Sequence, residues 1–135
     1  MPEARTLVPG DASGPALVLS EPLSFWGGID PATGEVIDPH HPQHGASVRG
    51  TVLVMPGGRG SSSSSSVLAE AIRAGVGPAA IVLTEPDPIV ALGAIVAREL
   101  YGAVVPVVLL ASEDLEWTAE TTVRARPEGA LVGPR

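Results

Sequence analysis

The sequence VLVMPGGRGSSSSSSVLAEAI, residues 52–72, combines three local patterns that together decide the fold. Residues 48–55 are rich in apolar and β-branched side chains, which is typical of a buried strand. The run Pro-Gly-Gly-Arg-Gly then ends the strand in a tight turn. Six serines follow at 61–66, and apolar residues recur at 67, 68, 71 and 72 with helical spacing. We therefore predict a strand, a glycine- and serine-rich loop and a helix in direct succession.

The same patterns continue in both directions along the chain. Residues 79–83 and 104–110 predict buried strands, and residues 88–100 predict a helix between them. The apolar stripe of that helix consists of Ile89, Leu92, Val96 and Leu100. Residues 4–8 and 15–19 read as two strands of a hairpin, and residues 118–126 as a closing strand. We predict an α/β fold with central parallel strands joined by helices, in a single domain spanning residues 1–135.

Residues 20–46 form a long irregular stretch that is full of turn-forming residues. A loop of this length inside a compact domain is commonly functional. Its aromatic and apolar content predicts that it packs on the domain. Trp26 fits either a substrate pocket or the core, and Asp30 fits the start of the turn Asp-Pro-Ala-Thr-Gly.

The overall composition excludes several classes of partner. The net charge of −7 argues against nucleic acid and against an anionic membrane surface, because both attract basic proteins. The chain has no cysteine, so it cannot by itself bind an iron–sulfur cluster or a thiolate zinc ion. Its first residues lack a signal-peptide pattern, and its apolar runs are shorter than the ~20 residues of a membrane helix. A cytoplasmic protein is the expectation.

The loop at 57–66 carries the clearest chemical signal. Glycines allow close backbone approach, and a helix N-terminus with Arg59 and serine hydroxyls is suited to a carboxylate or phosphate. The loop lacks the lysine of a Walker A motif, the third glycine of a dinucleotide fingerprint and the Gly-x-Ser-x-Gly of a hydrolase elbow. A flexible serine linker and a simple helix cap remain alternatives.

Two other groups of polar residues are weaker candidates. His40, His41 and His44 lie near Asp38, but their spacing matches no metal-ligand pattern and the prolines around them indicate a surface turn. Their function is left open, and we predict no metal site on this chain. Glu85 precedes Pro-Asp-Pro and is interpreted as a turn or cap residue beside the next helix.

Three segments of the chain resemble the aconitase X swivel domain family. They are PLSFWGGIDPATG at 22–34, VLVMPGGRGSSS at 52–63 and GAIVA at 93–97, and the resemblance covers about residues 4–110. It implies a single swivelling β/β/α domain like the aconitase swivel domain. It also implies a small-subunit role in a hydro-lyase, beside a large partner chain that holds an iron or iron–sulfur centre.

The resemblance further implies roles for individual residues. Ser61, the first serine after Gly-Arg-Gly, corresponds to the family's proton acceptor. Arg59, Gly60, Ser62 and Ser63 are then expected to bind a small hydroxy acid. The family dehydrates cis-3-hydroxy-L-proline in bacteria and mevalonate 5-phosphate in archaea. The uninterrupted serine run favours the hydroxyproline branch.

Three alternatives stay open at the level of sequence. One is the small subunit of a phosphomevalonate dehydratase. Another is a phosphohistidine-type swivelling module, although no histidine precedes Gly93 at positions 91 or 92. The last is a non-catalytic module whose serine loop binds an anion. Which serine of 61–66 faces a substrate is also left open.

Overall fold

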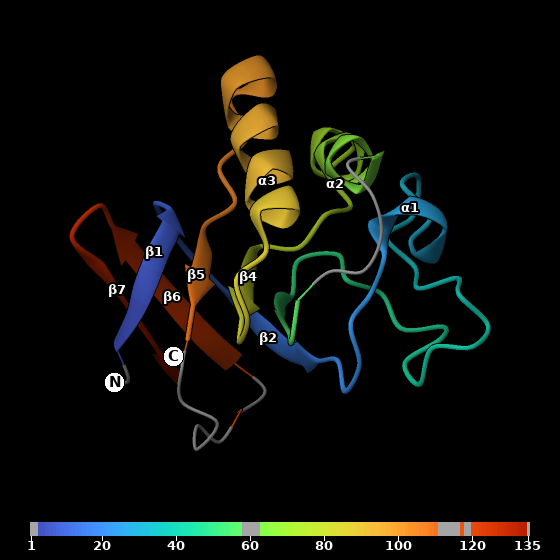
Figure 1. The fold of residues 1–135 in the computed structure, drawn as a ribbon, viewed down its shortest axis with the longest axis horizontal. Helices are drawn as coiled ribbons and strands as arrows, with labels where there is room; N and C mark the ends of the chain where they lie inside the picture. The colour runs from blue at the N-terminus through green and yellow to red at the C-terminus, as the bar shows by residue number, and fades with distance from the viewer. Residues whose placement is uncertain (1–2, 58–62, 111–116, 118–119, 135) are drawn as a thin grey trace.

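A computed structural model describes residues 3–57, 63–110, 117 and 120–134 (Figure 1). The strands are β1 (Glu3–Val8), β2 (Gly10–Val18), β3 (Val52–Met55), β4 (Ala80–Leu83), β5 (Val107–Leu109), β6 (Glu120–Arg126) and β7 (Gly129–Pro134). The helices are the single turn α1 (Phe25–Gly28) and the longer α2 (Ser63–Arg73) and α3 (Pro88–Tyr101). The predicted α/β class is confirmed.

The described strands close into a barrel in the order β1-β5-β4-β3-β2-β6-β7. Strands β2, β3, β4 and β5 are mutually parallel, as β-α-β connections require. The other pairings are antiparallel. Both long helices lie on one side of this barrel, above the parallel strands in Figure 1. The central prediction, parallel strands joined by helices, is therefore confirmed.

The parallel strands contribute to two hydrophobic clusters among the described residues. Leu53 and Met55 of β3 face the helices, whereas Val52 and Val54 face the barrel interior. Strand β4 divides in the same way, with Ile81 and Leu83 on the helix side. A strand buried on both faces must be apolar at every position. This explains why these segments show no polar alternation in the sequence.

Several predicted elements need correction. Residues 9–14 were predicted to be a hairpin turn, but β2 begins at Gly10, pairs with β3 and β6, and makes no described pair with β1. Strand β3 begins at Val52 rather than at residue 48, because Val48 and Thr51 form a turn in which the Thr51 hydroxyl donates to the Val48 carbonyl at 2.8 Å. Strand β7, which pairs with β1 and completes the barrel, was not predicted.

The packing face of α3 also differs from the prediction. Its buried residues are Val90, Gly93, Ala94 and Ala97. Within the predicted stripe, Leu92 is 48% exposed and Leu100 is 68% exposed. Small side chains on the buried side allow close approach to α2, where a Cβ on Gly93 would lie 3.0 Å from the carbonyl oxygen of Ser65. The predicted helix is thus confirmed, but the prediction of its buried face is wrong.

The long loop packs on the domain, as predicted, and it does so on the helix side of the molecule. Leu23, Phe25 and Ile29 are about 1% exposed and join the same cluster as α2 and α3. Isolated bridges between Ile29 and Val36 and between Glu35 and Ser47 order the rest of the loop. No helix among the described residues has the length and apolar character that crossing a membrane requires.

Candidate functional site at the helix N-termini

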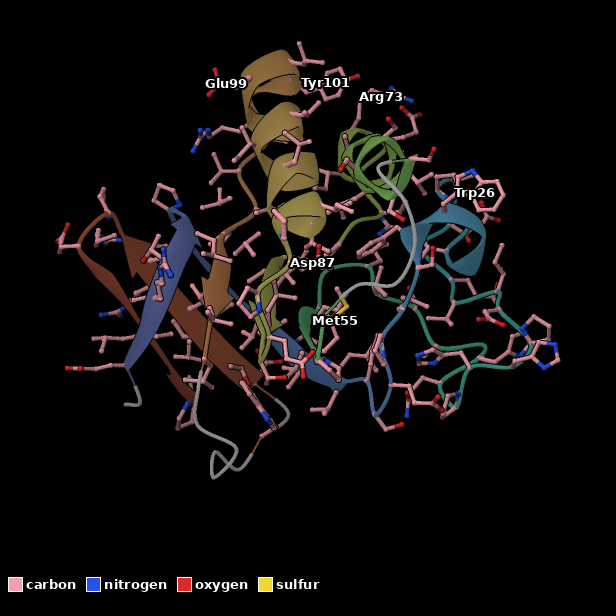
Figure 2. The ribbon with its side chains drawn as sticks, in the orientation of Figure 1. Trp26, Met55, Arg73, Asp87, Glu99 and Tyr101 are labelled. Atoms are coloured by element: carbon pink, nitrogen blue, oxygen red, sulfur yellow. The ribbon has the colours of Figure 1, made fainter. Side chains whose placement is uncertain are left out.

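The candidate site lies where β3 and β4 end and where α2 and α3 begin. In parallel α/β structures, the carboxyl ends of the strands and the N-termini of the following helices are the usual place for ligands. Gly57 follows β3, and the segment Glu85, Pro86, Asp87 follows β4. Figure 2 labels Met55 at the end of β3 and Asp87 at the start of α3. The topology therefore brings both connections to one edge of the barrel.

A pocket of about 240 Å³ opens at this edge. Its walls come from three parts of the chain. These are the turn at Leu23 and Phe25, the residues Gly57 and Ser64 on either side of Ser61 in the sequence, and the start of α3. The full set of described lining residues is Leu23, Phe25, Gly57, Ser64, Glu85, Pro86, Asp87, Pro88, Ile89 and Val90. The charged groups among them are the carboxylates of Glu85 and Asp87.

The predicted site residues are only partly described. Arg59, Gly60, Ser61 and Ser62 lie outside the described residues. Ser63 is exposed and is the first residue of α2. The linker interpretation is wrong for residues 63–66, because these serines form the first turn of a packed helix.

Two serines of the run are buried, which the sequence did not indicate. Ser64 is 4% exposed and Ser65 is 6% exposed. The backbone N–H of Trp26 donates to the Ser64 hydroxyl at 3.4 Å, and the Ser65 hydroxyl donates to the Ile89 carbonyl at 2.8 Å. Buried hydroxyls require such partners. Six identical residues in sequence give no signal that would separate these two from the others.

Asp87 caps α3. Its Oδ1 accepts hydrogen bonds from the backbone N–H groups of Ile89 at 3.0 Å and Val90 at 3.2 Å. Pro88 occupies the first helical position, where its missing N–H costs nothing. Glu85, interpreted as a turn or cap residue, lies in a bend after β4, is exposed and lines the pocket, whereas the cap itself is Asp87.

The segment that contains His40, His41 and His44 has a structural role, because His41 links it to the backbone of Glu21. His41 is 7% exposed, its Nδ1 accepts from the backbone N–H of Gln43 at 3.0 Å, and its Nε2 lies 3.2 Å from the carbonyl oxygen of Glu21. Nδ1 must be unprotonated to accept, so Nε2 carries the proton and donates to Glu21. No group of three potential metal ligands occurs among the described residues. His40 and His44 are exposed on the surrounding turn.

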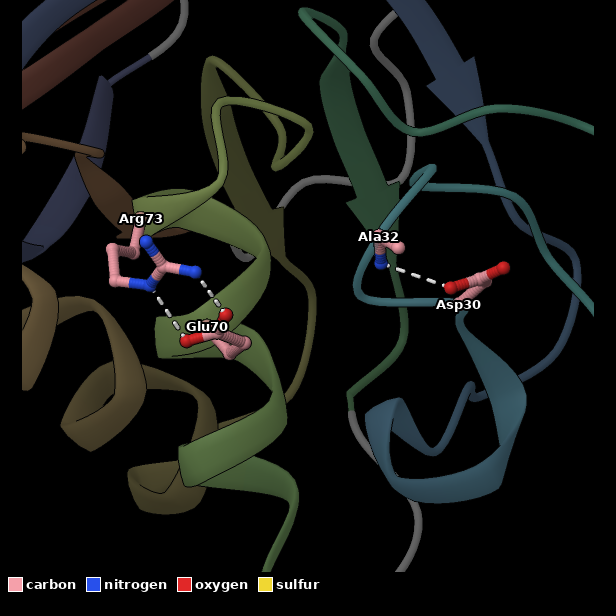
Figure 3. Close-up of polar contacts among 4 residues, drawn as sticks. All are labelled: Asp30, Ala32, Glu70 and Arg73. Atoms are coloured by element: carbon pink, nitrogen blue, oxygen red, sulfur yellow. Dashed lines mark hydrogen bonds and ion pairs between the residues drawn. The ribbon is translucent and has the colours of Figure 1, made fainter.

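Trp26 is not a core residue, because its side chain is 63% exposed on the outer side of α1 (Figure 2). The core positions beside it are occupied by Leu23, Phe25 and Ile29. Asp30 takes the predicted turn role: its Oδ1 accepts from the backbone N–H of Ala32 at 2.9 Å (Figure 3).

The shifted pKa values belong to surface ion pairs rather than to the pocket. The hydrogen bond from Arg73 lowers the pKa of Glu70 on the outer face of α2 (Figure 3). The hydrogen bond from Arg126 likewise lowers the pKa of Asp11, which links β6 to β2. Both pairs are well exposed, so their contribution to stability is small.

Comparison with known proteins identifies the family of this arrangement. The family model described as the aconitase X swivel domain matches residues 2–131. Cis-3-hydroxy-L-proline dehydratase of Pseudomonas aeruginosa is 47% identical over 151 aligned positions, which cover 97% of this chain and 26% of that protein. The phosphomevalonate dehydratase small subunit of Methanothermobacter thermautotrophicus is 47% identical over 113 positions, covering 84% of this chain and 82% of that protein.

The structural comparison agrees. A crystal structure of Thermococcus kodakaraensis aconitase X in its holo-form matches with a TM-score of 0.83 at 33% identity, covering 98% of both chains. The chain spans about a quarter of the length of the Pseudomonas dehydratase, at 26%. The family match covers strands β1 to β6, the start of β7, both long helices and the loop that contains Ser24, Phe25 and Trp26. The chain belongs to the aconitase X swivel domain family.

Proposed function

We propose that this chain is the small, swivelling component of a dehydratase that acts on cis-3-hydroxy-L-proline. Its active site would be shared with a large partner polypeptide, either fused or separate. Family membership supports this proposal, as do the names of the relatives, which are dehydratases of hydroxyproline and of phosphomevalonate. The observation that carries it is the pocket whose wall includes Gly57 and Ser64.

Those two residues flank the segment that contains Ser61. A substrate in the pocket therefore lies beside one residue that precedes Ser61 and one that follows it in the sequence. The remaining walls are the capped start of α3 and the Leu23–Phe25 side of the long loop. A pocket of about 240 Å³ suits a molecule of proline size, and its open side is where a partner would exclude water.

The chemistry assigned to this chain is proton removal. Dehydration takes a proton from the carbon beside a carboxylate and hydroxide from the neighbouring carbon. Ser61 accepts the proton, Arg59 binds the carboxylate, and Gly60, Ser62 and Ser63 orient the substrate. A serine is a weak base, but a helix N-terminus and a guanidinium both stabilise its alkoxide.

An iron or iron–sulfur centre is assigned to the partner polypeptide. The chain has no cysteine, and its described residues contain no group of three His, Asp or Glu side chains placed to hold a metal. The described residues of this chain therefore do not fit such a centre. Its own contribution is limited to proton transfer, substrate binding and exclusion of water.

The pocket favours an amino acid over a phosphorylated substrate. Sequence identity does not separate the two, since it is 47% to both named relatives. The charged lining residues described are Glu85 and Asp87, and both are acidic. Carboxylates attract the ammonium group of hydroxyproline and repel a phosphate dianion. The second candidate, a phosphomevalonate dehydratase small subunit, is favoured by the 82% coverage of that archaeal protein.

The decisive experiment is a turnover assay of the chain together with its large partner polypeptide. We expect dehydration of cis-3-hydroxy-L-proline and little turnover of mevalonate 5-phosphate. Ser61→Ala should lower kcat by about 10²–10⁴-fold, the usual contribution of a positioned acid or base. Ser47→Ala is the matched control, because Ser47 is exposed and does not line the pocket.

Each alternative has a distinct outcome in this assay. Preferred turnover of mevalonate 5-phosphate would assign the chain to the other branch. Normal turnover by Ser61→Ala with modestly weaker substrate binding would show a non-catalytic anion-binding loop. Full activity of the chain without any partner would contradict the shared active site.

A further inference from the structure

The described serines of the run, 63–66, divide into exposed and buried members, and the buried pair has no role in the proposed reaction. Ser63 and Ser66 are exposed, whereas Ser64 and Ser65 are buried at 4% and 6% exposure. Neighbouring residues on a helix point about 100° apart, so Ser64 and Ser65 contact different neighbours. Their hydroxyls reach two separate parts of the fold.

Ser64 forms hydrogen bonds to the turn at residues 24–26 of the long loop. Its hydroxyl accepts from the backbone N–H of Trp26 at 3.4 Å, and its Oγ lies 3.4 Å from the Oγ of Ser24. The Ser24 hydroxyl donates its proton to the carbonyl oxygen of Trp26 at 2.9 Å. Since that proton is already used, the remaining bond runs from the Ser64 hydroxyl to Ser24. The three residues therefore form a closed ring of hydrogen bonds.

Ser65 bonds to the opposite side, at the start of α3. Its hydroxyl donates to the carbonyl oxygen of Ile89 at 2.8 Å, within the turn that Asp87 caps. The two helices are in close contact there, because a Cβ on Gly93 would lie 3.0 Å from both the Ser65 carbonyl oxygen and Leu68. The first turn of α2 is thus bonded on one side to the long loop and on the other to α3.

We propose that Ser64 and Ser65 are positioning residues for Ser61 of the proposed dehydratase, because they hold the first turn of α2, which follows Ser61 in the sequence. In the sequence, Ser61 lies between Gly57, which follows β3, and the first turn of α2. Ser64 and Ser65 hold that turn from both sides, and Ser61 lies three residues before Ser64 in the sequence. This inference rests on the proposed function. A displacement of about 1 Å in a reacting group can cost on the order of 10² in rate.

The first test separates rate from binding. In the complete complex, Ser64→Ala and Ser65→Ala should each lower kcat about 10- to 100-fold while KM changes less than about 3-fold. Ser47→Ala is the matched control, since Ser47 also accepts a backbone hydrogen bond, from Arg49 at 3.3 Å, outside the pocket. It should leave kcat unchanged. Urea titration of each variant establishes that it is folded.

The second test does not depend on activity. Ser64→Ala removes the acceptor for the Trp26 N–H, so hydrogen exchange of that amide, measured by NMR on the full chain, should become at least about 10-fold faster. Ser47→Ala should leave its exchange rate unchanged. If the Trp26 amide exchanges faster in Ser64→Ala while kcat is unchanged in both Ser64→Ala and Ser65→Ala, the positioning role is overturned and the contacts are purely structural. Unchanged exchange in Ser64→Ala would overturn the hydrogen-bond ring itself.

The two proposals fail separately. If Ser61→Ala retains full turnover while Ser64→Ala and Ser65→Ala lower kcat, Ser61 is not the base, and the buried serines position a group of the active site other than Ser61. If Ser61→Ala abolishes turnover and neither buried serine affects kcat, the proposed function stands and the positioning inference is wrong.

Discussion

At the scale of the residue, Asp87 has two roles: it caps α3 and it lines the pocket. Its Oδ1 accepts from two orphan N–H groups, those of Ile89 and Val90, at the helix start. Asp87→Ala should therefore lower the free energy of unfolding by about 1 kcal/mol, within the range of about 0.5–2 for a lost N-cap. Urea denaturation of the chain measures it.

Asp87→Asn is the matched variant, because an amide oxygen still accepts both hydrogen bonds. Only the favourable contact between a negative charge and the helix dipole is lost, so the decrease should be smaller, at about 0.3–1 kcal/mol. If alanine and asparagine destabilise equally, the hydrogen bonds are not what Asp87 contributes.

Side-chain contacts between residues close in sequence could be predicted from the sequence, whereas contacts between distant residues could not. Asp30 was predicted to start a turn, and its acceptor role toward Ala32 spans two residues. Short polar side chains before such turns make this bond wherever they occur. The contact between Ser64 and Ser24 spans 40 residues. It depends on how the long loop packs against α2, for which a run of six serines contains no information.

At the scale of the element, α3 shows how apolar residues on both faces mislead a sequence pattern. The stripe Ile89, Leu92, Val96, Leu100 has correct helical spacing and larger side chains than the opposite face. The buried face nevertheless consists of Val90, Gly93, Ala94 and Ala97. Close packing against α2 requires small side chains, and this requirement outweighs the larger apolar area of the stripe. Periodicity predicted the helix but not its contact face.

Substitutions on the two faces of α3 should therefore change the free energy of unfolding by different amounts. Ala94 is 0% exposed, and Ala94→Leu would force a larger side chain into a packed interface, lowering the free energy of unfolding by about 1–3 kcal/mol. Leu92 is 48% exposed, and Leu92→Ala should change it by less than about 1 kcal/mol.

Urea denaturation of the isolated chain separates the two orientations. If Leu92→Ala proved more destabilising than Ala94→Leu, the stripe predicted from the sequence would be the buried one after all.

At the scale of the whole molecule, the parallel centre was predictable and the closure of the barrel was not. Continuous apolar strands alternating with helices indicate parallel pairing, because both faces of such strands must be covered. Strand β7 has no comparable pattern, since Gly129 and Pro134 bound a short run that also contains Gly133. The pairing of β2 with β6 joins segments more than 100 residues apart, such as Asp11 with Arg124. Such pairings leave no local signature, so a hairpin of neighbouring strands was predicted instead.

The two hydrophobic clusters should unfold as one cooperative unit, because β3, β4 and β5 each place residues in both. Trp117 packs against the barrel cluster, whereas Trp26 lies on the turn bonded to α2. Trp26→Phe and Trp117→Phe each leave one tryptophan, so that fluorescence reports on one layer at a time. In each variant, the urea transition measured by tryptophan fluorescence should coincide with the transition measured by far-ultraviolet circular dichroism.

Substitutions inside each layer extend this argument. Leu68→Ala on the helix side should lower stability by about 2–5 kcal/mol, and Val132→Ala inside the barrel should lower it as well, because both side chains are 0% exposed. In a single cooperative unit, each substitution shifts the transitions of both tryptophans equally. If Val132→Ala moved the Trp117 transition and left that of Trp26 in place, the barrel and the helical layer would be separate units, and the shared strands would not couple them.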